Sequence, residues 1–454
     1  MKKLRSVVSA GLATIAIIST SVLHAEQPAQ IPLPKIERKS MLNGMQVLFL
    51  DSENGQCPFL LMIQNGAAFD PVDKWGVTDL MTRMLMDQLQ VGDYRSEFQA
   101  KGIKMQAETG WDAIFVEGSA PPEELEFALQ TLGEILVRPK FKEEAFDRLR
   151  EKTLAELDAL EKDPELRSES LFTSKLFGSN PYGHPVRGTA ETVSGLYFRD
   201  ILIQARRLLL PNQTSLAVYY SGDRGRLFER LARRWGGWVQ QKPLPFTFRP
   251  APVPSEPQIV LLEDASTEQC LVRWGYLGVE KSSRDFLTFK VLEEYLTLSL
   301  PGWAKEIEDS NQIRGYARYS GRRMPGCLQV SIETEPRFVT DYVAKLQAAV
   351  EDLRNGPPDE QRFGEAKSLV LQDFLKSFTD PEARIREILT SELYGLGLGF
   401  IPTFPLRLDR VTPERFQKDL AELLPSGGFV VVVVSSESSL VSDLKQFGQV
   451  EVLN

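Results

Sequence analysis

The sequence predicts an α+β fold built from two homologous αβ domains. Short apolar segments typical of strands alternate with longer segments whose apolar residues recur at helical spacing. The order of these segments in the first half returns in the second, and a proline-rich stretch separates the halves. Two copies of one unit fit a chain of 454 residues better than one large domain does.

The chain opens with a segment typical of a secretory signal peptide. Three basic residues precede an apolar run from Val7 to Leu23 that is short for a membrane span. We expect residues 1–25 to be removed on export, and the bacterial periplasm is the compartment we expect. Removal of three basic and no acidic residues takes the net charge from −9 to −12. Such an acidic chain disfavours nucleic acid and anionic membrane surfaces as partners.

The first domain is expected over residues 34–238. Its strands are predicted after a turn at residues 42–45, and at residues 59–63, 103–108, 113–117 and 215–220. Its helices are predicted at residues 76–86, 123–136, 146–162 and 197–209. In the first of these helices, apolar residues line one face, while Asp79, Thr82 and Arg83 share roughly the opposite side.

Residues 239–257 are expected to form a linker, because six prolines in this stretch prevent a helix or a central strand. The second domain is expected over residues 258–454, with strands at 259–262 and 270–276 and a helix at 286–298. A repeat supports this division. Phe146 precedes Pro164 of an Asp-Pro-Glu sequence by 18 residues, and Phe363 precedes Pro381 of a second such sequence by the same distance.

The succession of strand, glycine turn, Asp70-Pro71, Gly76 and apolar helix resembles the start of the pitrilysin/insulinase family of zinc peptidases. The resemblance extends over nearly the whole chain, from about residue 34 to residue 436. It implies that each domain is a mainly antiparallel sheet packed by helices, and that the chain forms one half of a clamshell. In that family the helix carries the zinc motif H-x-x-E-H. Aligned on Gly76, those motif positions hold Asp79, Thr82 and Arg83.

This departure from the motif predicts that the chain binds no zinc and has no catalytic residues. Arginine has no lone pair to offer a metal and adds a positive charge. The sequence contains two histidines, His24 in the leader and His184, so the mature chain cannot assemble a histidine pair. Asp79 and Arg83 are expected to form an ion pair across one helical turn. Glu156, at the position of the distal zinc ligand, lies 73 residues beyond Arg83. We expect it to pair with Arg83 in place of zinc.

Other candidate residues lie outside this motif. The resemblance implies peptide contacts in the second domain, and the matching region offers Arg314, Tyr316, Arg318 and Tyr319, although the family's usual upstream arginine falls on Asn311 or Glu308. These four residues could bind carbonyls or carboxylates, or could equally be the wet edge of a strand. We expect His184, in a loop between glycine and proline, to be a hydrogen-bonding surface residue.

The sequence contains three cysteines, Cys57, Cys270 and Cys327. At most one disulfide is possible, and Cys270 with Cys327 is the pair to test. Buried free thiols are the alternative.

Three classes of function remain open. The leading hypothesis is a non-catalytic subunit of an exported insulinase-like zinc peptidase, which binds peptide and closes a chamber with an active partner that alone carries zinc. The second is a stand-alone peptide-binding or scaffold protein. The third, an enzyme of different chemistry, is disfavoured because the sequence has no Ser/His/Asp set, phosphate loop or nucleotide fingerprint.

Overall fold

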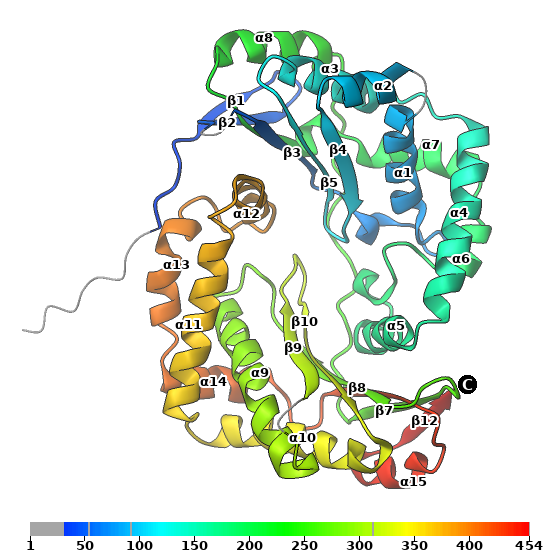
Figure 1. Cartoon of the computed structure of the whole chain (residues 1–454), viewed down its shortest axis with the longest axis vertical. Coiled ribbons are helices and arrows are strands. Elements are labelled where there is room, and N and C mark those ends of the chain that lie inside the picture. Colours follow the sequence, from blue (N-terminus) through cyan, green and yellow to red (C-terminus); the bar gives the residue numbers. More distant parts are fainter. Residues whose placement is uncertain (1–30, 53–54, 91–92, 311–312, 454) are drawn as a thin grey trace, which may run out of the picture.

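The computed structural model describes residues 31–454 except 53–54, 91–92, 311–312 and 454, so the expected signal peptide lies outside the described residues. The described chain contains two six-stranded sheets, each covered by helices (Figure 1). Most neighbouring strands in both sheets are antiparallel, and the predicted α+β class is therefore confirmed.

The first sheet has the strand order β1-β2-β6-β3-β5-β4, in which only β2 and β6 pair in parallel. Its strands are β1 (Glu37–Ser40), β2 (Gln46–Leu50), β3 (Cys57–Ile63), β4 (Lys104–Thr109), β5 (Ile114–Ala120) and β6 (Thr214–Tyr219). The helices of this half are α1 (Val77–Gln90), α2 (Asp93–Ala100), α3 (Leu125–Val137), α4 (Glu143–Glu161), α5 (Pro164–Phe177), α6 (Ala190–Ser194), α7 (Phe198–Leu208) and α8 (Arg224–Trp235).

The second sheet has the order β12-β7-β11-β8-β10-β9, and its last five strands follow the same pattern as β2-β6-β3-β5-β4. Its strands are β7 (Gln258–Glu263), β8 (Cys270–Leu277), β9 (Arg314–Ser320), β10 (Cys327–Thr334), β11 (Val430–Ser435) and β12 (Val450–Leu453). The helices of this half are α9 (Phe286–Glu308), α10 (Val339–Asn355), α11 (Glu360–Lys376), α12 (Pro381–Leu393), α13 (Phe400–Asp409), α14 (Pro413–Leu423) and α15 (Leu440–Leu444). Between Trp235 and Gln258 the chain forms neither helix nor strand.

Each half lends one helix to the sheet of the other half. Helix α5, from the first half, packs on β8 and β11, whereas α12, from the second half, packs on β3 and β6 (Figure 1). Both helices begin with an Asp-Pro pair in which the aspartate caps the helix N-terminus, Asp163 for α5 and Asp380 for α12. The two sheets are therefore joined by reciprocal packing as well as by the chain between them.

The pleat divides each sheet between two apolar clusters. In β2, for example, Val47 and Phe49 face the helices of the first half, while Leu48 and Leu50 belong to the large cluster shared with the second half. In the second sheet, one face packs on α9 and α10, and the opposite face meets α5 through Val430 and Val432. Because the central strands β6 and β11 are buried on both faces, this shared core holds the halves at a defined distance.

The cysteines are buried free thiols. Cys270 is the register partner of Thr334, and Cys327 is the partner of Leu277, so the two thiols lie at opposite ends of the β8–β10 ladder. The Cys270–Cys327 pair is therefore not bridged. Helix α9 is longer than predicted, because it continues past Pro301 to Glu308.

Candidate functional site

Helix α1 begins where the side chain of Asp70 satisfies its first backbone donors. The carboxylate accepts hydrogen bonds from the backbone N–H of Gly76 at 2.8 Å and of Thr78 at 3.2 Å. The apolar residues of α1 enter the core of the first half, as predicted. Helix α4 covers the opposite side of α1, so Thr82 is buried there and donates to the backbone carbonyl of Thr78.

Two glycines let the loop before α6 approach the start of α1. Gly76 has φ +92°, and a Cβ there would lie 2.4 Å from the carbonyl oxygen of Arg187. Gly188 has φ +76°, and a Cβ there would lie 2.2 Å from the carbonyl oxygen of Trp75. No other residue fits either position. This contact brings Arg187 close to Glu156 on α4.

Asp79, Arg83 and Glu156 form an ion-pair cluster between α1 and α4. Arg83 donates through Nε to Asp79 at 2.7 Å and through Nη1 to Glu156 at 2.7 Å. The guanidinium of Arg83 therefore bridges the two carboxylates, as the sequence predicts for each pair. Arg187 approaches Glu156 at 3.8 Å from the loop. The side chains are partly buried, with exposed fractions of 13% for Asp79, 20% for Arg83 and 32% for Glu156.

The two carboxylates respond differently to this guanidinium. Burial raises the pKa of Asp79, and the charge of Arg83 offsets that effect only in part. Burial also tends to raise the pKa of Glu156, which is the more exposed carboxyl. The hydrogen bond and the charge of Arg83 outweigh burial there, so the pKa of Glu156 is lowered. Burial lowers the pKa of Arg83. The charges and hydrogen bonds of Asp79 and Glu156 outweigh this effect and raise the pKa. Arg83 is thus held as a permanent cation.

These residues do not fit a zinc ion. A zinc site needs several lone-pair donors converging on one point, and here a guanidinium lies between the two carboxylates that remain. Within residues 31–454, apart from the short undescribed stretches, no group of three His, Cys, Asp or Glu side chains is arranged to hold a metal.

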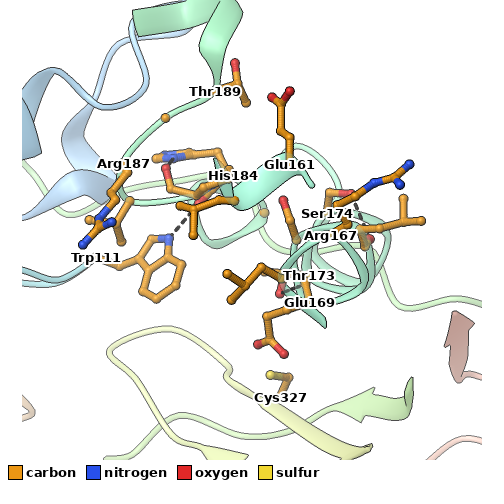
Figure 2. A pocket seen from close by; sticks show the side chains of 18 of the residues that line it. Trp111, Glu161, Arg167, Glu169, Thr173, Ser174, His184, Arg187, Thr189 and Cys327 are labelled. Atoms are coloured by element: carbon orange, nitrogen blue, oxygen red, sulfur yellow. Dashed lines mark hydrogen bonds between the residues drawn. The ribbon is translucent and has the colours of Figure 1, made fainter. Parts of the chain in front are cut away.

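A cleft of about 730 Å³ lies next to this cluster, between the two halves. It is bounded by the end of α4, by α5, by the loop of residues 183–189 and by β9 and β10 (Figure 2). Its aliphatic lining consists of Leu157, Leu160, Leu166, Leu171, Pro185, Val186, Leu262 and Leu453. Its charged lining consists of Glu161, Arg167, Glu169, Arg187, Arg318 and Arg322. A largely apolar cavity with a few charged groups is a typical ligand site.

His184 lies in the wall of this cleft and is buried, with 5% of the residue exposed, so the expectation of a surface histidine is wrong. Its ring stacks on Trp75 with centroids 5.1 Å apart, and the Nε1–H of Trp111 donates to its backbone carbonyl at 3.0 Å. Nδ1 lies 3.1 Å from the carbonyl oxygen of Pro185, which can only accept, so the proton of the neutral ring is on Nδ1. Nε2 has no hydrogen-bond partner among the described residues.

We expect acid to destabilise the protein through His184. Burial lowers the pKa of this imidazole, and the hydrogen bond to Pro185 only partly offsets that effect. Below the unfolded-state value of about 6.5, the unfolded chain binds the proton more readily than the folded one, so stability falls as the pH drops. A proton NMR titration should show an imidazole that stays neutral below pH 6.5. The loss of stability between pH 7 and 5.5 should be smaller in His184→Gln, and a normal titration near 6.5 would contradict this expectation.

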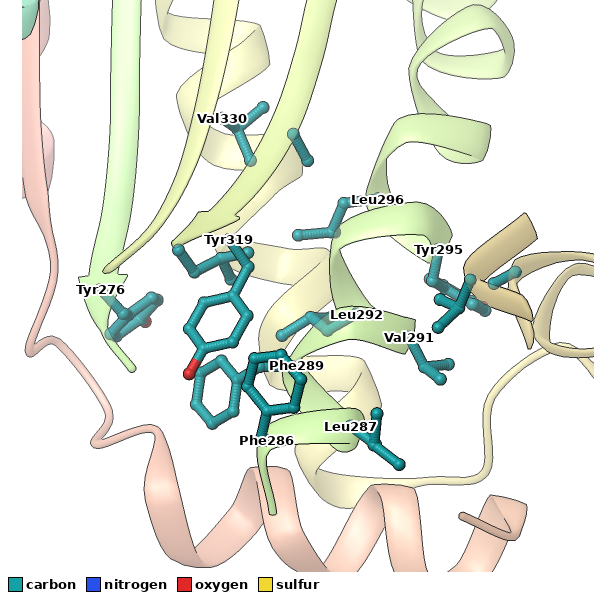
Figure 3. Packing of buried hydrophobic residues seen from close by; sticks show 14 of the residues in the cluster. Tyr276, Phe286, Leu287, Phe289, Val291, Leu292, Tyr295, Leu296, Tyr319 and Val330 are labelled. Atoms are coloured by element: carbon teal, nitrogen blue, oxygen red, sulfur yellow. The ribbon is translucent and has the colours of Figure 1, made fainter. Parts of the chain in front are cut away.

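The structure separates the four predicted peptide-contact residues. Tyr319 is 5% exposed, packs against Phe286 and Phe289, and donates a hydrogen bond from its hydroxyl to the backbone carbonyl of Val279 (Figure 3). Its assignment as a substrate contact is therefore wrong, because β9 turns every second side chain into the core. Arg314, Tyr316 and Arg318 share the exposed face. Of the four, only Arg318 lines the cleft.

The hairpin turn after β9 fastens the second half to the first, which the sequence did not indicate. Asp112 is buried, accepts from the hydroxyl of Tyr182, and accepts from the backbone N–H of Arg323 at 3.1 Å. Arg322 lies over the ring of Trp111 at 3.7 Å. The contacts of Arg323 with Asp112 and of Arg322 with Trp111 join residues more than 200 positions apart, and no local pattern marks such pairs.

The chain thus has two mainly antiparallel sheets around a cleft, and next to this cleft a guanidinium lies between two carboxylates. Residues 46–190 match the model of the insulinase family, peptidase family M16. This segment is thus similar to the insulinase family, and the resemblance seen in the sequence is confirmed. No curated protein matches the chain.

Solved structures share the fold over most of the chain. The peptidase M16 inactive domain from Pseudomonas fluorescens has a TM-score of 0.78 at 16% identity, over 89% of this chain and 98% of that one. Complex III2 from Candida albicans contains a chain with a TM-score of 0.77 at 16% identity, over 91% and 98%. The periplasmic protease PqqL from Escherichia coli has a TM-score of 0.74 at 14% identity, over 91% of this chain and 49% of PqqL. At these identities the likeness shows the fold alone.

Proposed function

We propose that the chain is a non-catalytic subunit of an exported insulinase-like zinc peptidase. It binds peptide in its cleft and closes a chamber with an active partner chain, which supplies the zinc. The observation that carries this proposal is the guanidinium of Arg83 between Asp79 and Glu156. A permanent cation at this point repels a metal while it keeps α1 and α4 together, so the shape of the fold persists without its chemistry.

Other observations support the remaining parts of this proposal. One similar structure is described as an inactive M16 domain, and another belongs to a multi-subunit complex. The similar protease PqqL is periplasmic, which agrees with the signal peptide expected at residues 1–25. Among the described residues no helix is long and apolar enough to cross a membrane. The shared strand order of the two sheets supports an internal repeat, with domains at residues 34–238 and 258–454.

The test measures zinc content and peptide cleavage for the purified mature chain, alone and mixed with a co-encoded chain that carries an intact H-x-x-E-H motif. We expect no zinc and no cleavage from the chain alone, and cleavage that depends on both chains in the mixture. If mixing has no effect while peptide still binds, the chain is a stand-alone peptide-binding scaffold. Stoichiometric zinc with cleavage by the lone chain would overturn the proposal.

A further inference from the structure

Some of the charged residues that line the cleft pair with residues outside the lining, and others do not. Arg167 pairs with Asp264 at 2.8 Å, and Glu169 pairs with Arg273 at 2.7 Å. Arg187 approaches Glu156 at 3.8 Å. Each of these lining charges thus faces an opposite charge from a residue outside the lining.

Arg318, Arg322 and Glu161 are the lining charges that remain, and none of them has an ion-pair partner among the described residues. Arg322 rests on the rings of Trp111 and Tyr182 and stays positive there. Asp112 lies close enough to Arg322 for their charges to interact, so Arg318 is the lining cation that no carboxylate of the described residues faces, in a chain whose net charge is −9. Local charge of this sign attracts anionic ligands.

Arg318 differs from its neighbour on the same strand face. Arg314 lies four residues earlier on β9, points to the same side and pairs with Glu333 at 3.0 Å. The guanidinium of Arg318 has neither a carboxylate within ion-pair distance nor a hydrogen-bond acceptor in the described part of the chain. A free guanidinium fork at the wall of an apolar cavity is suited to a carboxylate, which it binds through two parallel hydrogen bonds.

The rest of the lining indicates what carries that carboxylate. The aliphatic walls formed by α4, α5 and the loop of residues 183–189 suit an apolar side chain. Nε2 of His184, without a partner among the described residues, can accept a hydrogen bond from a backbone N–H. An apolar group, an amide N–H and a carboxylate occur together in a peptide.

We propose that the cleft selects peptide segments that carry a carboxylate beside an apolar residue, with Arg318 as the residue that determines this specificity. The carboxylate comes either from the chain terminus or from an Asp or Glu side chain. This inference rests on the proposed function, because it assumes that peptide enters the cleft.

The test uses three dye-labelled apolar peptides and measures their affinity for the mature chain by fluorescence anisotropy. One peptide has a free C-terminal carboxylate, the second is its C-terminal amide, and the third is an amide with glutamate next to the last apolar residue. We expect the amide without glutamate to bind about tenfold more weakly than the better of the other two. The comparison of the free acid with the glutamate peptide tells which source of carboxylate fits.

Arg318→Gln should abolish this preference, so that the three peptides bind with equal affinity. The matched control is Arg314→Gln, which removes the same charge from the same strand face outside the cleft lining. Equal binding of all three peptides, or equal effects of the two substitutions, would overturn the inference and leave the proposed peptide binding intact. If no peptide binds at all, the proposed peptide binding fails, and this inference fails with it.

Discussion

Replacing Arg83 with alanine is expected to lower the free energy of unfolding by about 2–4 kcal/mol, because it leaves two carboxylates facing each other without a cation. The charged form of Asp79 is destabilised more than that of Glu156, because Asp79 is the more buried of the two and burial already raises its pKa. Part of the lost stability should return at low pH, where Asp79 is protonated. Chemical denaturation at pH 7 and pH 5 measures both effects.

The chain offers a matched control for this substitution. Arg148 on α4 pairs with Asp87 on α1 at 2.7 Å, so it links the same two helices, but its side chain is 55% exposed. Arg148→Ala should cost less than about 1 kcal/mol, as is usual for exposed ion pairs. If Arg83→Ala and Arg148→Ala cost the same, the bridge at Arg83 is only a surface ion pair and does not hold the former motif together.

Restoring the zinc motif is expected to give the chain a metal site. The combined substitutions Asp79→His, Thr82→Glu and Arg83→His place two imidazoles one turn apart on α1, on the side that faces Glu156. We expect the triple variant to bind about one zinc ion per chain, while the parent chain binds none. Metal analysis after dialysis and a competition titration with a chelator measure the difference.

Adding Glu156→Gln to the triple variant provides the control. It removes the third ligand and should weaken zinc binding by about 100-fold or more, since even outer hydrogen-bond partners of zinc ligands contribute about 10- to 100-fold. If the triple variant takes up no zinc although it folds, then Asp79 and Arg83 do not occupy the motif positions. The alignment on Gly76 would then be wrong.

Much of the fold is readable from local patterns. The strands around Leu48, Leu61 and Val260 and the helix that carries Arg83 lie where apolar periodicity places them, because each depends on residues close in sequence. Local patterns predict the ends of helices and strands less well than their positions. Helix α9 continues through Pro301, where tertiary contacts outweigh the local cost of a proline.

The candidate site was only partly predictable. The partners of Arg83 followed from the position of Asp79 one turn earlier and from the resemblance that singled out Glu156. The cleft had no local signal, because its walls come from segments far apart in the sequence. The burial of His184 was missed for the same reason. Its neighbours Trp75 and Trp111 lie more than 70 positions away.

The sequence by itself determined that the chain without its expected leader cannot form a site with two histidine ligands. A count of two histidines is a property of the covalent chain, and no arrangement in space adds a ligand that is absent. Only the tertiary structure decided which polar residues face a ligand. Helix α5 packs on the sheet of the second half, and α12 packs on the sheet of the first half. Tyr319 is buried, whereas Arg318 lies at the wall of the cleft. These outcomes depend on packing between distant segments, whose free energy is not encoded in any single stretch of sequence.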